Sequence, residues 1–176
     1  MRVGIELRAA SEGDLPAIAR IYAHHVLTGF GSFEEAPPDL AELDRRRRDV
    51  AARGLPYLVA EAGGAIVGFA YASPYRARSA YRYTLEDSVY VAEGATRRGN
   101  GRALLATLIE HCTALGFRQM VAVIGDNANA ASIGLHQALG FVPAGRLAAI
   151  GFKRGRWIDS VLMQRALGPG SESPPR

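Results

Sequence analysis

The spacing of apolar positions predicts an alternation of strands and helices along the chain. Apolar and polar residues alternate over residues 3–9, which is typical of a strand with one buried face. After Ser11, a residue type that caps helices, apolar side chains recur at helical spacing from Leu15 to Val26. Residues 29–38 are rich in Gly and Pro and predict a loop.

The same criteria assign the rest of the chain. Gly63 and Gly64 are expected to join two strands as a hairpin, and Gly140 is expected to end the last helix. Predicted strands cover residues 57–62, 65–73, 84–92, 119–124, about 146–152 and 157–165, and predicted helices cover residues 39–53, 99–115 and 130–139. The order β α α β β β α β α β β predicts an α/β fold with a mixed sheet and helices on both faces.

Composition fits one domain. The 176 residues are 48% hydrophobic, which is enough to form a core. We expect a single domain over residues 1–167 and a disordered tail over residues 168–176, which have little to bury. No run of 18 apolar residues and no signal-peptide core is present, so a soluble, cytoplasmic protein without a membrane partner is expected. The single cysteine, Cys112, excludes an intramolecular disulfide and lies on an apolar helical row, where packing is expected.

The charge is basic, with a net charge of +4. This balance suits an anionic ligand and does not establish nucleic-acid binding. Four consecutive arginines at residues 45–48 are flanked by Asp and Glu in a predicted helix, which favours a solvated helix face, and no nucleic-acid partner is expected. The adjacent His24 and His25 point about 100° apart on a helix, so no metal site is predicted.

The segment 88–105 carries the most specific chemistry. A β-branched strand there enters a turn with glycines and the basic residues Arg97, Arg98 and Arg102, and the turn opens a helix. Helix-start amides, the helix dipole and these cations together favour a phosphate group. A Walker A loop is excluded because no Gly-Lys-Ser/Thr is present, and Leu104 occupies the place where a dinucleotide fingerprint needs a small residue. A plain strand-to-helix connection is the alternative.

The element order, the segment 89–105 and the segment 129–141 (NAASIGLHQALGF) resemble the GCN5-related N-acetyltransferase (GNAT) superfamily over almost the whole chain. Within it, residues 81–91 (YRYTLEDSVYV) and 151–159 (GFKRGRWID) look like the phosphinothricin and methionine sulfoximine acetyltransferase branch. The resemblance implies a twisted mixed sheet of about six to seven strands flanked by about four helices. The chain departs from the family at Thr96, where the phosphate turn usually opens with Gln or Arg.

By this resemblance the cofactor is acetyl-CoA, and no metal is involved. Its pantetheine arm would pair with the backbone of Val89, Tyr90 and Val91 as an added strand. The resemblance places the diphosphate on Arg97, Arg98, Gly99, Asn100, Gly101 and Arg102, and it turns Asn129, Ser132 and His136 toward the cofactor. Asn129 could instead be only a helix cap, and Ser132 and His136 could pack within the protein.

The resemblance also implies the chemistry. An α-amine with a pKa near about 8 is mostly protonated at neutral pH, so a base must accept its proton. Glu86 matches the general base of the family, acting directly or through a water; a carboxylate paired with an arginine is the alternative. No tyrosine stands where some members protonate the leaving thiolate, which leaves His136 as a candidate acid.

An arginine fork binds a carboxylate while aromatic side chains enclose the rest of a small acceptor. The candidate acceptor residues are Phe33, Arg76, Arg78, Tyr81, Tyr83 and Glu86. The predicted function is transfer of the acetyl group to the α-amine of a small amino acid or analogue of the phosphinothricin, methionine sulfoximine or methionine sulfone type. Peptide acetylation and non-catalytic acetyl-CoA sensing are the alternatives. The resemblance also favours a homodimer. Phe152, Trp157 and Ile158 are candidates for the contact, and packing within the chain is the alternative for them.

Overall fold

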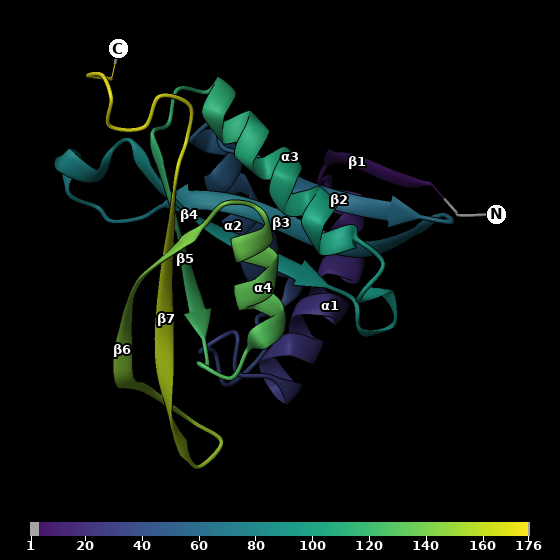
Figure 1. Cartoon of the computed structure of the whole chain (residues 1–176). Coiled ribbons are helices and arrows are strands. Elements are labelled where there is room, and N and C mark those ends of the chain that lie inside the picture. The colour runs from purple at the N-terminus through teal and green to yellow at the C-terminus, as the bar shows by residue number, and fades with distance from the viewer. Residues whose placement is uncertain (1–3, 176) are drawn as a thin grey trace.

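The computed structural model describes residues 4–175. Its seven strands form one sheet in the order β1-β2-β3-β4-β5-β7-β6 (Figure 1). The strands are β1 (Ile5–Ala9), β2 (Tyr57–Ala62), β3 (Ala65–Pro74), β4 (Thr84–Val91), β5 (Gln119–Gly125), β6 (Val142–Lys153) and β7 (Arg156–Ala166). The helices are α1 (Leu15–Thr28), α2 (Leu40–Ala52), α3 (Asn100–Ala114) and α4 (Ala130–Ala138). The predicted element order and the mixed α/β fold are confirmed.

Helices cover both faces of the sheet, as expected, with α3 and α4 in front of it and α1 and α2 behind it in Figure 1. Successive side chains of β4 point to opposite faces of the sheet, so their contacts show which helices cover each face. The Tyr90 ring lies 5.0 Å from the ring of Tyr22 in α1, whereas Asp87 bonds His136 in α4. Cys112 is fully buried in α3, which confirms its packing role.

Two element boundaries differ from expectation. Ser11 caps a 3-10 turn, Glu12–Asp14, in which the Asp14 carboxylate accepts from the Ser11 amide. The α-helix starts directly after this turn, at Leu15. Strand β6 starts at Val142 because pairing with β7 continues past Pro143 through an irregularity at Pro143/Gly145. Proline at an irregular edge position costs no ladder bond, so the strand begins at Val142, before the start near Arg146 that the sequence pattern predicted.

The centre of the sheet is a wedge between β4 and β5. These two strands are parallel and pair over only three positions, from Thr84 with Gln119 to Glu86 with Val121. Beyond Glu86, β4 stays paired with β3 as far as Val91, while β5 stays paired with β7 as far as Gly125. Each strand therefore follows its own neighbour, and the backbones of the two strands separate.

The last residues lie against the start of β5. The Arg118 guanidinium donates to the backbone carbonyls of Gly170, Ser173 and Pro174 at 2.8–3.1 Å. The structure therefore gives these residues a defined place, and the disorder expected for the tail stays a prediction. Within residues 4–175, no helix has both the length and the apolar composition that a membrane crossing requires.

Candidate active site

The wedge exposes one side of the β4 backbone. The Ala92 amide donates to the Val67 carbonyl at 2.9 Å, which fixes the phase of the ladder between β4 and β3. Successive residues of a strand direct their amide and carbonyl groups to opposite neighbours. Ser88 and Tyr90 therefore direct theirs to β3, and Val89 and Val91 direct theirs into the wedge, where an extended ligand can pair with them.

His25 of α1 occupies one of these backbone groups. Its Nε2 lies 2.8 Å from the Val91 carbonyl, which can only accept a hydrogen bond. Burial lowers the pKa of His25, although the bond to Val91 opposes this change. The ring is consequently a neutral donor near pH 7, and it leaves the amide of Val91 and both groups of Val89 directed into the wedge.

The turn after β4 is built by its own side chains. Thr96 Oγ1 donates to the Glu93 carbonyl at 3.2 Å, and the buried Asn100 Nδ2 donates to the Ala95 carbonyl at 2.8 Å. Arg97 and Gly99 adopt left-handed conformations with φ of 58° and 86°. Turns of this kind form concave arrays of N–H groups that suit anions. The side chains of Thr96 and Asn100 thus hold the turn. Because the Asn100 side chain is used in this way, Asn100 can offer a ligand only its backbone amide.

The three arginines of the turn, Arg97, Arg98 and Arg102, are exposed. Within residues 4–175 no ion pair engages them, in contrast to the arginines of α2. The turn therefore combines backbone amides with three free cations at the open end of the wedge. This arrangement suits a diphosphate.

Glu86 lies at the point where β4 and β5 separate. It is half-buried, and its side chain shares a sheet face with Tyr90 and with Ser73, its partner in β3. Burial raises the pKa of Glu86, the charge of Asp87 raises it further, and Arg76 lowers it. No ion pair involves Glu86 within the described part of the chain, which argues against the alternative of an arginine-paired carboxylate. A raised pKa makes a carboxylate a better base.

An aromatic surface continues from Glu86 along the same face, and the sequence analysis did not predict it. Phe69 stacks with Tyr57, Tyr71 and Tyr90, with ring centroids 5.1–6.5 Å apart. A small cavity here is lined by Tyr22, Leu43, Arg46, Tyr57, Phe69 and Tyr71. The signal was present in the sequence, because Phe69 and Tyr71 alternate in β3 and Tyr90 lies in β4, but β-propensity alone explains such a pattern equally well.

Arg46 corrects the interpretation of the arginine run. It lines this cavity and pairs with Glu34 at 2.6 Å, and Glu34 also accepts a hydrogen bond from the Tyr22 hydroxyl at 2.9 Å. The expected solvated face therefore does not extend fully to Arg46 and Arg47, whose side chains are 35% and 17% exposed. The expectation holds for Arg45 and Arg48, whose exposed side chains pair with acidic residues of their own helix.

His136 and Asp87 form a buried pair beneath β4. The His136 Nε2 lies 2.9 Å from Asp87 Oδ2, and its Nδ1 lies 2.7 Å from the Ser132 carbonyl. The Ser132 carbonyl can only accept, and an ionised Asp87 carboxylate also accepts, so the two contacts favour an imidazolium that donates from both ring nitrogens. Burial alone would lower the pKa of His136, but the bond to Asp87 and its charge outweigh burial and raise it. With both protons engaged, His136 is poorly placed to protonate a leaving group.

Two other predicted cofactor residues, Asn129 and Ser132, lie at the start of α4. Asn129 is the N-cap of that helix and accepts a hydrogen bond from the Ser132 amide at 3.2 Å. The Ser132 carbonyl holds His136, and its hydroxyl lies 3.4 Å from the same ring. The cap role weighed for Asn129 is thus present in the structure, and the cofactor roles of Asn129 and Ser132 stay predictions.

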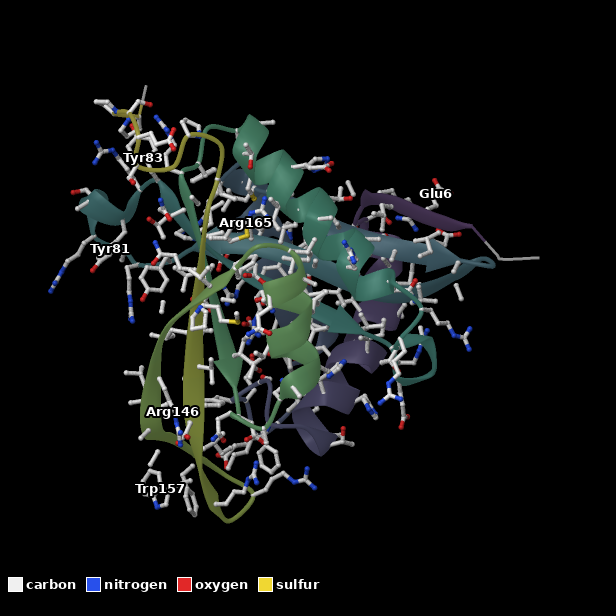
Figure 2. The ribbon with its side chains drawn as sticks, viewed as in Figure 1. Glu6, Tyr81, Tyr83, Arg146, Trp157 and Arg165 are labelled. Carbon is white, nitrogen blue, oxygen red and sulfur yellow. The ribbon has the colours of Figure 1, made fainter. Side chains whose placement is uncertain are left out.

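The predicted acceptor residues divide between two ends of β5. The carbonyl of Tyr83 accepts from the Arg118 and Gln119 amides at the start of the strand, and Arg76 lies close enough to affect Glu86. Arg78 and Tyr81 are exposed beside them, and Figure 2 shows Tyr81 and Tyr83 far from Trp157 at the turn between β6 and β7. Phe33 instead lies against Gly125 at the end of β5. Glu86 stands between the two groups.

Within residues 4–175 there is no cluster of three or more His, Cys, Asp or Glu side chains that could hold a metal ion. The wedge brings together a half-buried carboxylate, an exposed strand edge and a basic turn. The sequence pattern of the acetyltransferase (GNAT) family matches residues 18–141, which span all of these features.

This chain belongs to the acetyltransferase (GNAT) family. It is 56% identical to a phosphinothricin N-acetyltransferase of Alcaligenes faecalis, over 99% of this chain and 92% of that relative. It is 40% identical to an L-methionine sulfoximine/L-methionine sulfone acetyltransferase of Pseudomonas aeruginosa, over 96% of this chain and 98% of the relative. A solved structure of a GNAT superfamily phosphinothricin acetyltransferase from Sinorhizobium meliloti, in complex with AcCoA, matches with a TM-score of 0.95 and 48% identity over 98% of this chain and 93% of that one.

These matches confirm three predictions made from the sequence: the family, the fold class and the enzyme class. The branch resemblance drawn from residues 81–91 and 151–159 agrees with the phosphinothricin and methionine sulfoximine relatives. The roles of single residues in this acetyltransferase remain predictions.

Proposed function

We propose that this acetyltransferase transfers the acetyl group of acetyl-CoA to the α-amine of a small amino acid analogue of the phosphinothricin or methionine sulfoximine type. The wedge between β4 and β5 carries the proposal, because it joins an exposed strand edge, a basic turn and a half-buried carboxylate in one line. The names of the two relatives support the acceptor class.

The cofactor would be held mainly by backbone groups. Val89 and Val91 present amides to the wedge for the pantetheine arm, and Tyr90 contributes its place in the strand between them. The diphosphate would meet the amides of Gly99, Asn100 and Gly101 and the side chains of Arg97, Arg98 and Arg102. The Thr96 departure costs little on this reading, because the Thr96 hydroxyl holds the turn rather than facing a ligand.

Glu86 would act as the general base. The neutral amine attacks the thioester carbon, a C–N bond forms and the C–S bond breaks. The attacking nitrogen keeps one hydrogen in the amide and gives its surplus proton to the departing sulfur, directly or through solvent, so CoA leaves as a thiol. Glu86 takes up the ammonium proton directly or through a water, and its raised pKa brings it closer to the pKa of the amine. A β4 amide in the wedge would stabilise the negative charge that develops on the thioester oxygen.

The acceptor would lie along the aromatic face beside Glu86. Arg76 and Arg78 are the candidates for the carboxylate, with Tyr81, Tyr83 and Phe33 around the acceptor and with Tyr71 and Tyr90 as walls beside the base. His136 contributes through Asp87 and the position of β4 and not as an acid.

We also propose a homodimer built on β6 and β7. Strand β6 is an edge strand of 12 residues, and exposed apolar side chains gather on the hairpin: Val142, Leu147, Ile150, Phe152 and Trp157. A long apolar edge favours association. Ile158, in contrast, is buried within the chain, so it is not available to a partner. Sedimentation that gives the mass of a single chain at micromolar concentration would contradict this assembly.

The experiment that tests the function measures thiol release from acetyl-CoA with phosphinothricin, methionine sulfoximine, methionine sulfone, ordinary amino acids and a short peptide. Wild type and Glu86→Gln are compared. We expect turnover of an amino acid analogue that falls roughly 10²–10⁴-fold in the variant while acetyl-CoA still binds. Turnover that prefers the peptide, or no turnover at all, would refute the proposed acceptor class. Such an enzyme would act in the cytoplasm and protect its host from phosphinothricin, the herbicide-resistance role that the resemblance suggests.

A further inference from the structure

The loop of residues 29–33 bridges the open end of the wedge. On the β4 side, Ser32 Oγ lies 3.0 Å from the hydroxyl of Tyr22, whose ring packs on Tyr90. On the other side, the loop passes the Asn129 side chain and the end of β5, because a Cβ built on Gly31 would lie 3.7 Å from Asn129 Nδ2. This loop therefore contacts elements on both sides of the gap.

Phe33 seats the loop between two glycines from different strands. A Cβ built on Gly151 of β6 would lie 2.5–2.9 Å from three atoms of the Phe33 ring, and one built on Gly125 of β5 would lie 2.9 Å from another. Real Cβ atoms do not approach other atoms so closely, so the ring occupies space that only glycine leaves open.

Lys153 holds the same loop through hydrogen bonds to its backbone. It stands at the end of β6, only 3% of it is exposed, and its Nζ donates to the Gly29 carbonyl at 3.1 Å and to the Ser32 carbonyl at 2.7 Å. A buried ammonium is tolerated only when such partners satisfy it, and carbonyls left without it lose their partners as well. The two carbonyls belong to the first and fourth residues of the bridging segment, so one side chain holds the segment at two points.

Arg154 and Arg156 also contact the loop or the residues next to it, but both side chains are largely exposed. Arg156 lies 3.9 Å over the Phe30 ring and pairs with Asp126, and Arg154 donates to the Thr28 carbonyl at 2.7 Å. Exposed contacts of this kind contribute little, so the buried Lys153 is the main attachment.

We infer that Lys153 is a positioning residue for the acceptor: it holds residues 29–33 across the wedge and keeps Phe33 in the slot formed by Gly125 and Gly151. The inference rests on the proposed function, which places the acceptor beside Glu86 with Phe33 of this loop among its contacts. The basic turn that would hold the cofactor is built by Thr96 and Asn100, apart from the loop. Loss of Lys153 should therefore affect the acceptor and spare acetyl-CoA.

Three variants test the inference. Lys153→Met keeps the length of the side chain and removes the donor, whereas Gly151→Ala leaves Lys153 intact and displaces Phe33 from its slot. Gly145→Ala, in the same strand with nothing within 4 Å of the added Cβ, is the matched control. The readouts are hydrogen exchange of residues 29–33, the acceptor KM and the Kd of acetyl-CoA, all for protein that melts cooperatively.

We expect faster exchange of residues 29–33 and an acceptor KM raised by at least about ten-fold in both test variants, because small displacements of positioning residues cost large factors. The Kd of acetyl-CoA should change by less than about three-fold, and Gly145→Ala should match wild type. Unchanged exchange in a folded Lys153→Met protein, or an unchanged acceptor KM, would overturn the inference. If the wild type acetylates no acceptor, the proposed function fails instead, and the exchange data alone decide whether Lys153 anchors the loop.

Discussion

Replacing His136 with Leu should destabilise the protein strongly, because it leaves the Asp87 carboxylate buried without a partner. The side chains of His136 and Asp87 are only 5% and 2% exposed, and Asp87 Oδ1 has no hydrogen-bond partner among the described residues. The carboxylate thus depends on His136. Removing one member of a buried ion pair typically costs about 3–5 kcal/mol.

For a domain of this size each kcal/mol lowers the Tm by about 2–4 °C, so the expected loss is roughly 6–20 °C. The double variant Asp87→Val with His136→Leu removes both charges and should recover most of this loss, since an apolar pair of similar size is close to neutral. Urea unfolding followed by circular dichroism measures both effects.

The pH dependence gives an independent check. Burial alone lowers the pKa of His136, but Asp87 raises it more, so the folded value exceeds the unfolded value of about 6.5. The stability that this shift contributes is fully present below that value and is lost as pH rises through the folded pKa. The stability difference between wild type and His136→Leu should consequently shrink at alkaline pH. A cost below about 1 kcal/mol, a double variant as weak as the single one, or a difference that grows with pH would refute the reasoning.

Three further predictions concern packing and the base. Gly68→Ala should lower the free energy of unfolding by about 1–3 kcal/mol, because the new Cβ would lie 2.9 Å from the Tyr90 carbonyl oxygen and 3.0 Å from Leu104 Cδ1. Gly134→Ala in α4 should raise it by up to about 1 kcal/mol, because a Cβ there has nothing within 4 Å beyond its neighbouring helix backbone. Thermal melts compare the two variants. Arg76→Gln removes the charge that lowers the pKa of Glu86, so the acid limb of the kcat/KM profile should move to higher pH, and an unmoved limb would separate Glu86 from catalysis. Glu86→Gln should raise the Tm at pH 7, where burial makes the ionised carboxylate unfavourable, and the gain should vanish below the unfolded pKa of about 4.5.

The element order was predictable because each element carries its own periodicity and its own breakers. The hairpin at Gly63 and Gly64 and the helix end at Gly140 required only local information, and all three glycines adopt positive φ. The glycine-bearing turn before α3 was also readable, since the residues that shape it are adjacent in the chain.

The pairings across the fold were not predictable in the same way. Nothing local distinguishes Asp87 from any other strand residue, and its pairing with His136 joins positions 49 apart. Lys153 meets Gly29 and Ser32 across more than 120 residues, and Arg46 turns toward the sheet because Glu34 lies there. A periodicity assigns a face to a residue, but only the packed fold supplies the partner.

The short pairing of β4 with β5 also bears on how the protein unfolds. β1 to β4 form one antiparallel unit and β5 to β7 another, and three residue pairs join the two in the sheet. A ligand in the wedge would connect the parts of β4 and β5 that do not pair with each other. The protein with ligand would therefore unfold with a different cooperativity from the protein without it. At a hundred times its Kd such a ligand would add about 2.7 kcal/mol to the free energy of unfolding. The supply of acetyl-CoA would then regulate the lifetime of the enzyme along with its rate.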